Sequence, residues 1–130
     1  MTEEPRLKTR LRVQAVLRRL DGDLVPAAVR RSGDPDAGAL LVKVDRRDGT
    51  ASVFSQTRDM EGRPAWLAAT GPEPVADADA ESYIARELRF DPDLWVVEVE
   101  DPSGRNPFDE TTAAAPDDPA RAEAEKLFRR

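Results

Sequence analysis

Two copies of an Asp-Pro-Asp motif, Asp34–Asp36 and Asp91–Asp93, place four carboxylates in two short segments of the chain. If the two segments converged in the fold, their oxygens would suit a divalent cation such as Mg²⁺ or Ca²⁺. The same motif is also typical of turns, because Asp accepts hydrogen bonds from nearby backbone N–H groups and Pro restricts φ. We favour turns, and we predict neither a metal nor a cofactor.

Arginines flank both acidic motifs, since Arg30 and Arg31 precede the first and Arg89 precedes the second. Guanidinium groups in these positions either bind an anionic ligand or pair with Asp34 and Asp36, and we favour the ion pairs. No residue is assigned a catalytic role. The candidate binding residues are Arg30, Arg31, Asp34, Asp36, Arg89, Asp91 and Asp93.

Glu98 and Glu100 alternate along the last apolar segment and therefore point to one face of a strand, about 7 Å apart. Two carboxylates at that separation can share a metal ion or act as an acid and base pair. The simpler interpretation, which we favour, is the solvated end of a strand whose first half is buried.

Composition removes several catalytic classes, because the chain contains neither Cys nor His. Thiolate nucleophiles, Ser-His-Asp triads and Cys/His zinc sites are thereby excluded. The net charge of −6 is uneven, since residues 1–31 carry eight Arg and Lys against four Asp and Glu. An acidic body repels phosphate, so we expect no nucleic-acid partner.

The chain of 130 residues has the usual size of one domain. Its first residues lack the apolar stretch of a secretory signal. No apolar run approaches the roughly 20 residues that cross a bilayer. We expect a cytoplasmic protein without a membrane partner.

The elements that must position these residues follow from periodicity. Val13, Val16, Leu17 and Leu20 form the stripe of an amphipathic helix over 9–20, for which Thr9 is a candidate N-cap. A second helix is predicted over 78–89. An Asp-Gly pair at 48–49 indicates a hairpin. Strands are predicted over 25–31, 39–45, 50–57, 65–70 and 94–100.

Two of the strands are apolar on both faces over part of their length, at 39–42 and 94–97. Such strands lie centrally in a sheet that is covered on each side. Trp66 and Trp95 are predicted to lie in or near the core.

The predicted fold is α+β, in the order α-β-β-β-β-α-β. Short connections favour a largely antiparallel four- to five-stranded sheet with two packed helices. This single domain covers residues 6–105. Residues 106–130 are rich in Pro, Ala and acidic residues, which predicts a flexible tail. Asp118 and Pro119 would open a short terminal helix.

The stretches Arg30–Val44, Asp48–Ala51, Tyr83–Arg86 and Arg89–Glu98 resemble a family of short, mostly alphaproteobacterial proteins known as domain of unknown function 1491. The resemblance covers about residues 6–105. It implies a bacterial origin and supports the domain boundary, but it brings no activity, cofactor or catalytic residue.

The leading hypothesis for function is a non-enzymatic, cytoplasmic protein-binding or adaptor module whose partner is another protein. The alternative is a carboxylate-based, divalent-metal-dependent hydrolase built from the Asp-Pro-Asp motifs with Glu98 and Glu100. The sequence leaves the oligomeric state open. Contact between the two acidic loops around a cleft would favour the hydrolase.

Overall fold

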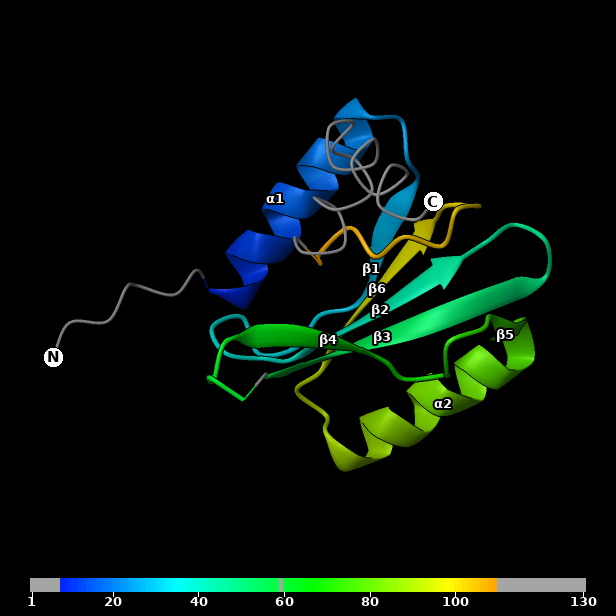
Figure 1. Ribbon diagram of the computed structural model, residues 1–130. Helices are drawn as coiled ribbons and strands as arrows, with labels where there is room; N and C mark the ends of the chain where they lie inside the picture. The colour runs from blue at the N-terminus through cyan, green and yellow to red at the C-terminus, as the bar shows by residue number, and fades with distance from the viewer. Residues whose placement is uncertain (1–7, 59, 110–130) are drawn as a thin grey trace, which may run out of the picture.

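The computed structural model describes residues 8–58 and 60–109 and shows two helices and a mixed sheet (Figure 1). The order predicted from the sequence is confirmed, with one addition: the short strand β5 precedes the second helix. The elements are α1 (Thr9–Gly22), β1 (Ala27–Arg31), β2 (Leu40–Asp45), β3 (Thr50–Arg58), β4 (Pro64–Ala68), β5 (Val75–Ala76), α2 (Asp77–Phe90) and β6 (Trp95–Glu100).

The strands follow the order β1-β6-β2-β3-β4, with β5 paired to β3. Most neighbours are antiparallel, as predicted, but β2 and β6 run parallel and the sheet is therefore mixed. A parallel pair requires a long crossover connection, which the segment from β3 to α2 provides. β2 and β6 are both central, as their two apolar faces predicted.

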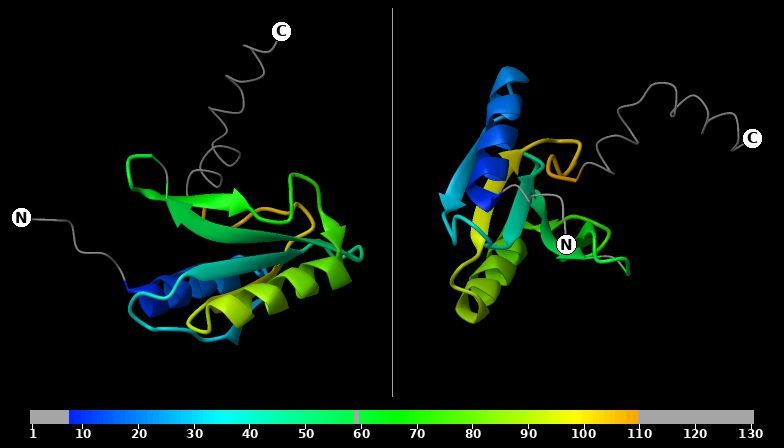
Figure 2. Two further views of the ribbon diagram at one scale, coloured as in Figure 1. Left: turned by 90° about the horizontal axis from the view of Figure 1, so that it is seen from below. Right: turned by 90° about the vertical axis from the view of Figure 1, so that its left-hand side faces the viewer.

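The two helices lie on opposite faces of the sheet and form a three-layer arrangement (Figures 1 and 2). On the α1 side, the core includes Val13 and Leu20 of the helix together with Leu40, Val42, Val44, Trp95, Val97 and Val99. On the α2 side, Ala80 and Ile84 pack with Leu41, Ala51, Val53, Leu94 and Val96. Alternate residues of β2 and β6 thus enter different cores, as the pleat of a strand requires.

The N-terminus of α1 is held by the first acidic loop and not by the predicted Thr9 cap. Lys8 occupies the N-cap position, and Thr9 is the first residue of the helix. The amides of Thr9 and Arg10 donate to the carbonyls of Asp36 and Pro35, at 3.3 and 3.0 Å. These carbonyls satisfy helix N–H groups that lack an intrahelical partner.

Residues 106–109, which the sequence assigned to the tail, contact the α1 side of the sheet. Phe108 is 5% exposed, and its ring lies 6.2 Å from that of Trp66. Arg19 donates to the carbonyl of Pro107 at 2.7 Å. The rest of the predicted tail, including its terminal helix, lies outside the described residues. Within the described ranges, no helix is long and apolar enough to cross a membrane.

Candidate functional site

The two Asp-Pro-Asp loops do meet in space, but they meet through their backbones. The amide of Asp34 donates to the carbonyl of Asp93 at 3.0 Å, and the indole N–H of Trp95 donates to the carbonyl of Asp34 at 2.7 Å. A Cβ atom on Gly33 would lie 2.0 Å from the Asp93 carbonyl oxygen. The close approach therefore depends on glycine.

The carboxylates of these loops form the turns themselves. Asp34 accepts from the amide of Asp36, and Asp91 accepts from the amide of Asp93, both at 3.0 Å. Asp36 also pairs with the exposed Lys8 at 3.6 Å. Among residues 8–58 and 60–109, no group of three acidic residues could hold a metal ion. The loops have the geometry of turns, which is the interpretation that the sequence favoured.

A bulge in β1 places Arg30 and Arg31 on the same face of the sheet. In the ladder with β6, Val29 lies opposite Val97, but the register then shifts and Arg31 lies opposite Val96. Val97 belongs to the α1-side core and Val96 to the α2-side core. Side chains opposite one another share a face, so Arg31 lies on the α2 side. Consecutive residues of a regular strand would point to opposite faces.

Neither arginine pairs with Asp34 or Asp36, contrary to the favoured expectation. Arg30 binds both carboxylate oxygens of Glu81, at 2.6 and 2.8 Å, and also contacts Glu98 at 3.2 Å. Arg31 donates to the carbonyl of Pro92 at 2.8 Å. The pairing differs from the expectation because the bulge turns Arg31 to the α2 side and because α2 brings Glu81 into contact with Arg30.

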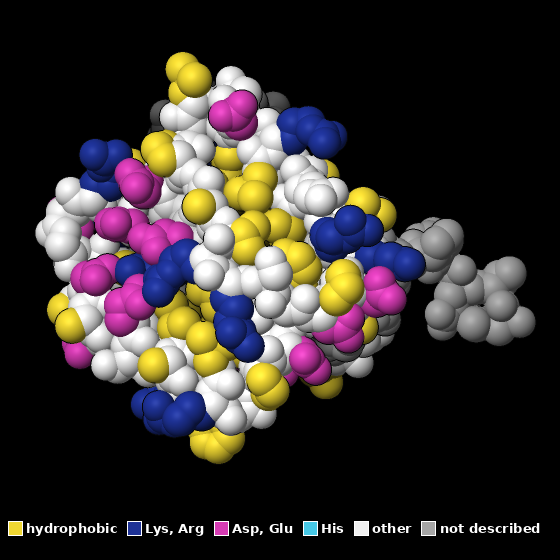
Figure 3. All heavy atoms as spheres, turned by 180° about the vertical axis from the view of Figure 1, so that it is seen from behind, with side chains coloured by type: hydrophobic (Ala, Val, Ile, Leu, Met, Phe, Trp, Pro, Cys, Tyr) yellow, Lys and Arg dark blue, Asp and Glu magenta, His cyan; other side chains and the backbone are white. Residues whose placement is uncertain are grey.

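A pocket of about 270 Å³ lies between β1 and α2. The two arginines share it with the aliphatic side chains of Ile84, Leu88 and Val96. Seen from behind, the molecule shows basic side chains bordering hydrophobic ones, with acidic side chains on both sides of this face (Figure 3). We call this site the β1–α2 pocket. It offers positive charge beside an apolar surface, which suits a carboxylate attached to an apolar group.

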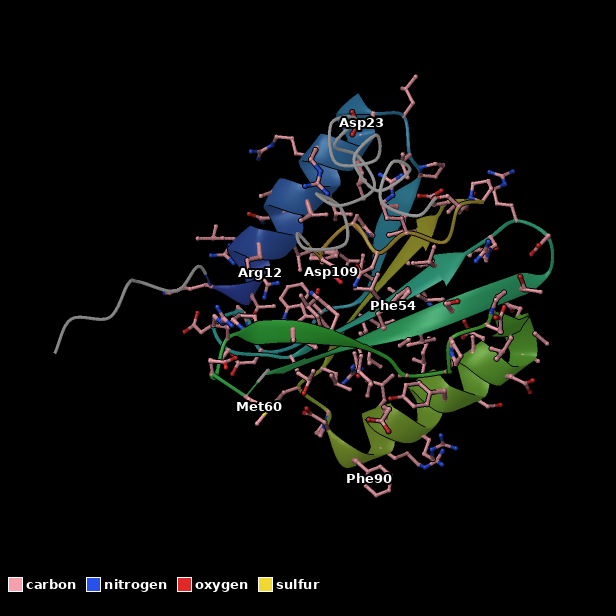
Figure 4. All side chains as sticks on the ribbon, viewed as in Figure 1. Arg12, Asp23, Phe54, Met60, Phe90 and Asp109 are labelled. Atoms are coloured by element: carbon pink, nitrogen blue, oxygen red, sulfur yellow. The ribbon has the colours of Figure 1, made fainter. Side chains whose placement is uncertain are left out.

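Arg89 does not line the β1–α2 pocket, although the sequence placed it among the candidate residues. It is exposed in the last turn of α2, where a positive charge is favourable to the helix dipole. The next residue, Phe90, is 78% exposed and points away from the sheet (Figure 4).

The sequence patterns did not identify a buried lysine beside the β1–α2 pocket. Lys43 is 3% exposed at the centre of β2. Its Nζ lies 2.6 Å from Asp77 Oδ1, 2.5 Å from Glu81 Oε2 and 3.8 Å from Glu98 Oε2. We call these four residues together with Arg30 the charge network. The signal in the sequence was a single Lys inside the apolar run Leu40–Val44.

Ion pairing within the charge network stabilises its charged forms. The hydrogen bond from Arg30 lowers the pKa of Glu81 to about 2, against the opposing effect of burial. Burial lowers the pKa of Lys43, but hydrogen bonds to Asp77 and Glu81 outweigh it and the net pKa is raised. The hydrogen bond to Glu81 likewise raises the pKa of Arg30. All three groups are therefore charged at neutral pH.

Glu98 and Glu100, proposed as the solvated end of β6, are half-buried and paired. Glu98 contacts Arg30 and Lys43, and Glu100 accepts from Arg47 at 2.8 Å. Each carboxylate is thus already bound to a cation of the protein.

Comparison with known proteins gives one family. The family model described as "Protein of unknown function (DUF1491)" matches residues 7–109. No curated protein matches the chain. The chain is 42% identical to a DUF1491 family protein from Caulobacter crescentus CB15 in its crystal structure, with a TM-score of 0.69 over 79% of this chain and 94% of that one.

Two structures determined in solution agree. An NMR structure of a DUF1491 family protein from Caulobacter crescentus CB15 is 41% identical, with a TM-score of 0.69 and coverage of 82% of this chain and 94% of that one. A protein from A. tumefaciens is 31% identical, with a TM-score of 0.61 and coverage of 74% and 86%. The resemblance inferred from the sequence motifs is confirmed.

Proposed function

The chain belongs to the DUF1491 family, whose function is unknown, and we propose that it is a non-enzymatic protein-binding module that acts through the β1–α2 pocket. The bulge in β1 is the observation that carries the proposal. By moving Arg31 to the face of Arg30, it places two guanidinium groups beside one apolar surface. Bulges commonly re-aim a side chain at functional sites.

The two arginines have different roles in this proposal. Arg30 is neutralised by Glu81 and Glu98, so it borders the pocket without offering much free charge. Arg31 is exposed and donates to a neutral carbonyl. Its charge is available to a partner, and a carboxylate is the group that a guanidinium binds with two parallel hydrogen bonds.

The lining of the β1–α2 pocket suits side chains of a protein. One cation, Arg31, lies beside aliphatic side chains there. An acidic side chain and a neighbouring aliphatic one would match Arg31 on one side and Ile84 with Leu88 on the other. The partner segment is therefore acidic and partly apolar.

The hydrolase alternative has less support. A hydrolase of that kind requires carboxylates that are free to hold a metal or move a proton. Asp34 and Asp91 instead accept backbone amides, and Glu98 and Glu100 are bound to cations of the protein. A protein remains the predicted partner, and the cytoplasm remains the predicted compartment.

A direct test is NMR titration of the ¹⁵N-labelled chain with the capped peptide Thr-Leu-Thr-Glu-Thr-Leu-Thr. We expect the amides of Arg31, Ile84, Leu88 and Val96 to shift, and we expect Arg31→Gln to weaken binding about tenfold, as the loss of one charge-assisted pair would. The matched control is Arg89→Gln, which removes the same charge outside the pocket. Equal binding by the peptide with Lys in place of Glu would contradict the proposal.

A further inference from the structure

Resting on the proposed function, we infer that the partner segment binds as an extended strand that pairs antiparallel with the outer edge of β1. β1 ends the strand order, and its single neighbour among the described residues is β6 (Figure 2, right). The other edge of β1 is therefore a row of backbone donors and acceptors with no strand from residues 8–58 or 60–109 beside it. Such an edge is a template for another strand.

The register identifies which backbone groups face outward. Glu100 donates to the carbonyl of Pro26 at 2.9 Å, so position 26 faces β6. Ala28, opposite Glu98, faces β6 in the same way, because alternate residues of an antiparallel pair share hydrogen bonds. The N–H and C=O groups of Ala27 and Val29 consequently point away from the sheet. Together they offer two donors and two acceptors.

The bulge limits the length of this edge and links it to the β1–α2 pocket. The ladder is regular from Ala27 to Val29 and shifts before Arg31, so pairing along β1 is short. A short ladder gives modest affinity, and side-chain contacts must supply the specificity. Side chains of an added strand alternate between the two faces of the sheet. Those on the α2 side would lie next to Arg31 and the β1–α2 pocket.

Charge favours a strand from an acidic partner over a second copy of this chain. A second copy would bring its own Arg30 and Arg31 to the edge, since β1 carries both. β1 contains no acidic residue, so the β1 strand of a second copy offers no carboxylate to Arg31, which has none among the described residues. An acidic strand instead supplies the missing negative charge.

Backbone N-methylation of the same peptide tests this binding mode without altering the protein. Ala27 and Val29, whose backbone groups point outward, lie on the α1 side of the sheet. In antiparallel pairing, the peptide residues opposite them also face the α1 side and direct their N–H groups to β1. With Leu and Glu on the α2 side, these residues are the Thr residues. N-methylation of the two central Thr residues should weaken binding about tenfold or more, because it removes two backbone hydrogen bonds. N-methylation of the two Leu residues, whose N–H groups point to solvent, is the matched control. Bound peptide should also slow hydrogen exchange at Ala27 and Val29.

The outcomes separate this inference from the proposed function. Weakening by methylated Thr but not by methylated Leu supports the antiparallel strand. Equal effects of both methylations, with binding still dependent on Arg31, overturn the strand and leave the pocket as the binding site. Absence of binding by the parent peptide overturns both. Dimerisation of the free chain through Ala27–Val29, seen by sedimentation and by the same amide shifts, would assign the edge to a second copy and overturn the inference.

Discussion

Lys43 and Glu98 lie opposite one another in the one parallel strand pair of the described sheet, with Nζ 3.8 Å from Oε2. A buried ammonium and a half-buried carboxylate thus occupy adjacent central strands. Because α2 adds Asp77 and Glu81 above them, the lysine is surrounded by three carboxylates. The packing of α2 on the sheet is therefore stabilised by ion pairs as well as by apolar contacts.

Replacing Lys43 by Met should lower the free energy of unfolding by about 2 kcal/mol, because Asp77 loses its cation while Glu81 and Glu98 keep only Arg30. Chemical denaturation measures the change. The control is Arg47→Met, which removes an exposed cation paired with Glu100 and should cost less than about 1 kcal/mol. Equal costs for the two variants would show that burial of Lys43 has no energetic consequence.

Stability should decline as the pH falls from about 5 towards 2. The pKa of Glu81 is lowered from 4.5 to about 2 by its hydrogen bond to Arg30, so the folded chain binds this proton less readily than the unfolded chain. Its contribution is complete above pH 4.5 and is lost as the pH approaches 2. The melting temperature of Glu81→Gln should depend less on pH across this range. If the melting temperature of Glu81→Gln depended on pH as strongly as that of the parent chain, other carboxylates would cause the loss of stability in acid.

Gly33→Ala should destabilise the fold by at least about 3 kcal/mol, because the added methyl meets backbone that has little room to move. The contact would be 2.0 Å to the carbonyl oxygen of Asp93. Gly22→Ala, at the end of α1 with nothing within 4 Å, should instead stabilise by about 0.5 kcal/mol. Thermal unfolding of both variants tests whether the contact between the two acidic loops is tight.

Phe108→Ala should cost about 3–4 kcal/mol, as expected for a buried aromatic side chain. Phe108 lies within the segment that the sequence assigned to the tail, and its ring packs beside that of Trp66. Phe90→Ala removes the same side chain from an exposed position and should cost less than about 0.5 kcal/mol. Denaturant titration distinguishes the two, and a negligible cost at Phe108 would mean that residues 106–109 contribute nothing to the fold.

Divalent cations at millimolar concentration should leave the melting temperature unchanged, both in the parent chain and when Asp36 and Asp93 are replaced by Asn. A bound ion would stabilise the folded state by mass action. Asp34 and Asp91 already accept backbone hydrogen bonds, and these two bonds do not involve the substituted carboxylates. A rise with Mg²⁺, Mn²⁺ or Ca²⁺ that the double substitution abolishes would favour the hydrolase over the binding module.

The sequence by itself determined most of the fold. The apolar stripe of α1 and the doubly apolar segments of β2 and β6 predicted which elements form and which strands are central, because periodicity and burial are local properties of the chain. The Asp-Pro-Asp motifs predicted turns for the same reason, since their hydrogen bonds join residues two positions apart. The family resemblance came from these same stretches.

Tertiary structure decided the candidate site. The bulge that brings Arg31 to the face of Arg30 depends on how β1 pairs with β6, from which it is separated by more than 60 residues. The partners of Arg30 and Lys43 are supplied by α2 and β6, which no local pattern places above those residues. Burial of Phe108 likewise depends on a distant surface. Such contacts join residues far apart in the chain, so only the packing of the whole domain determines them.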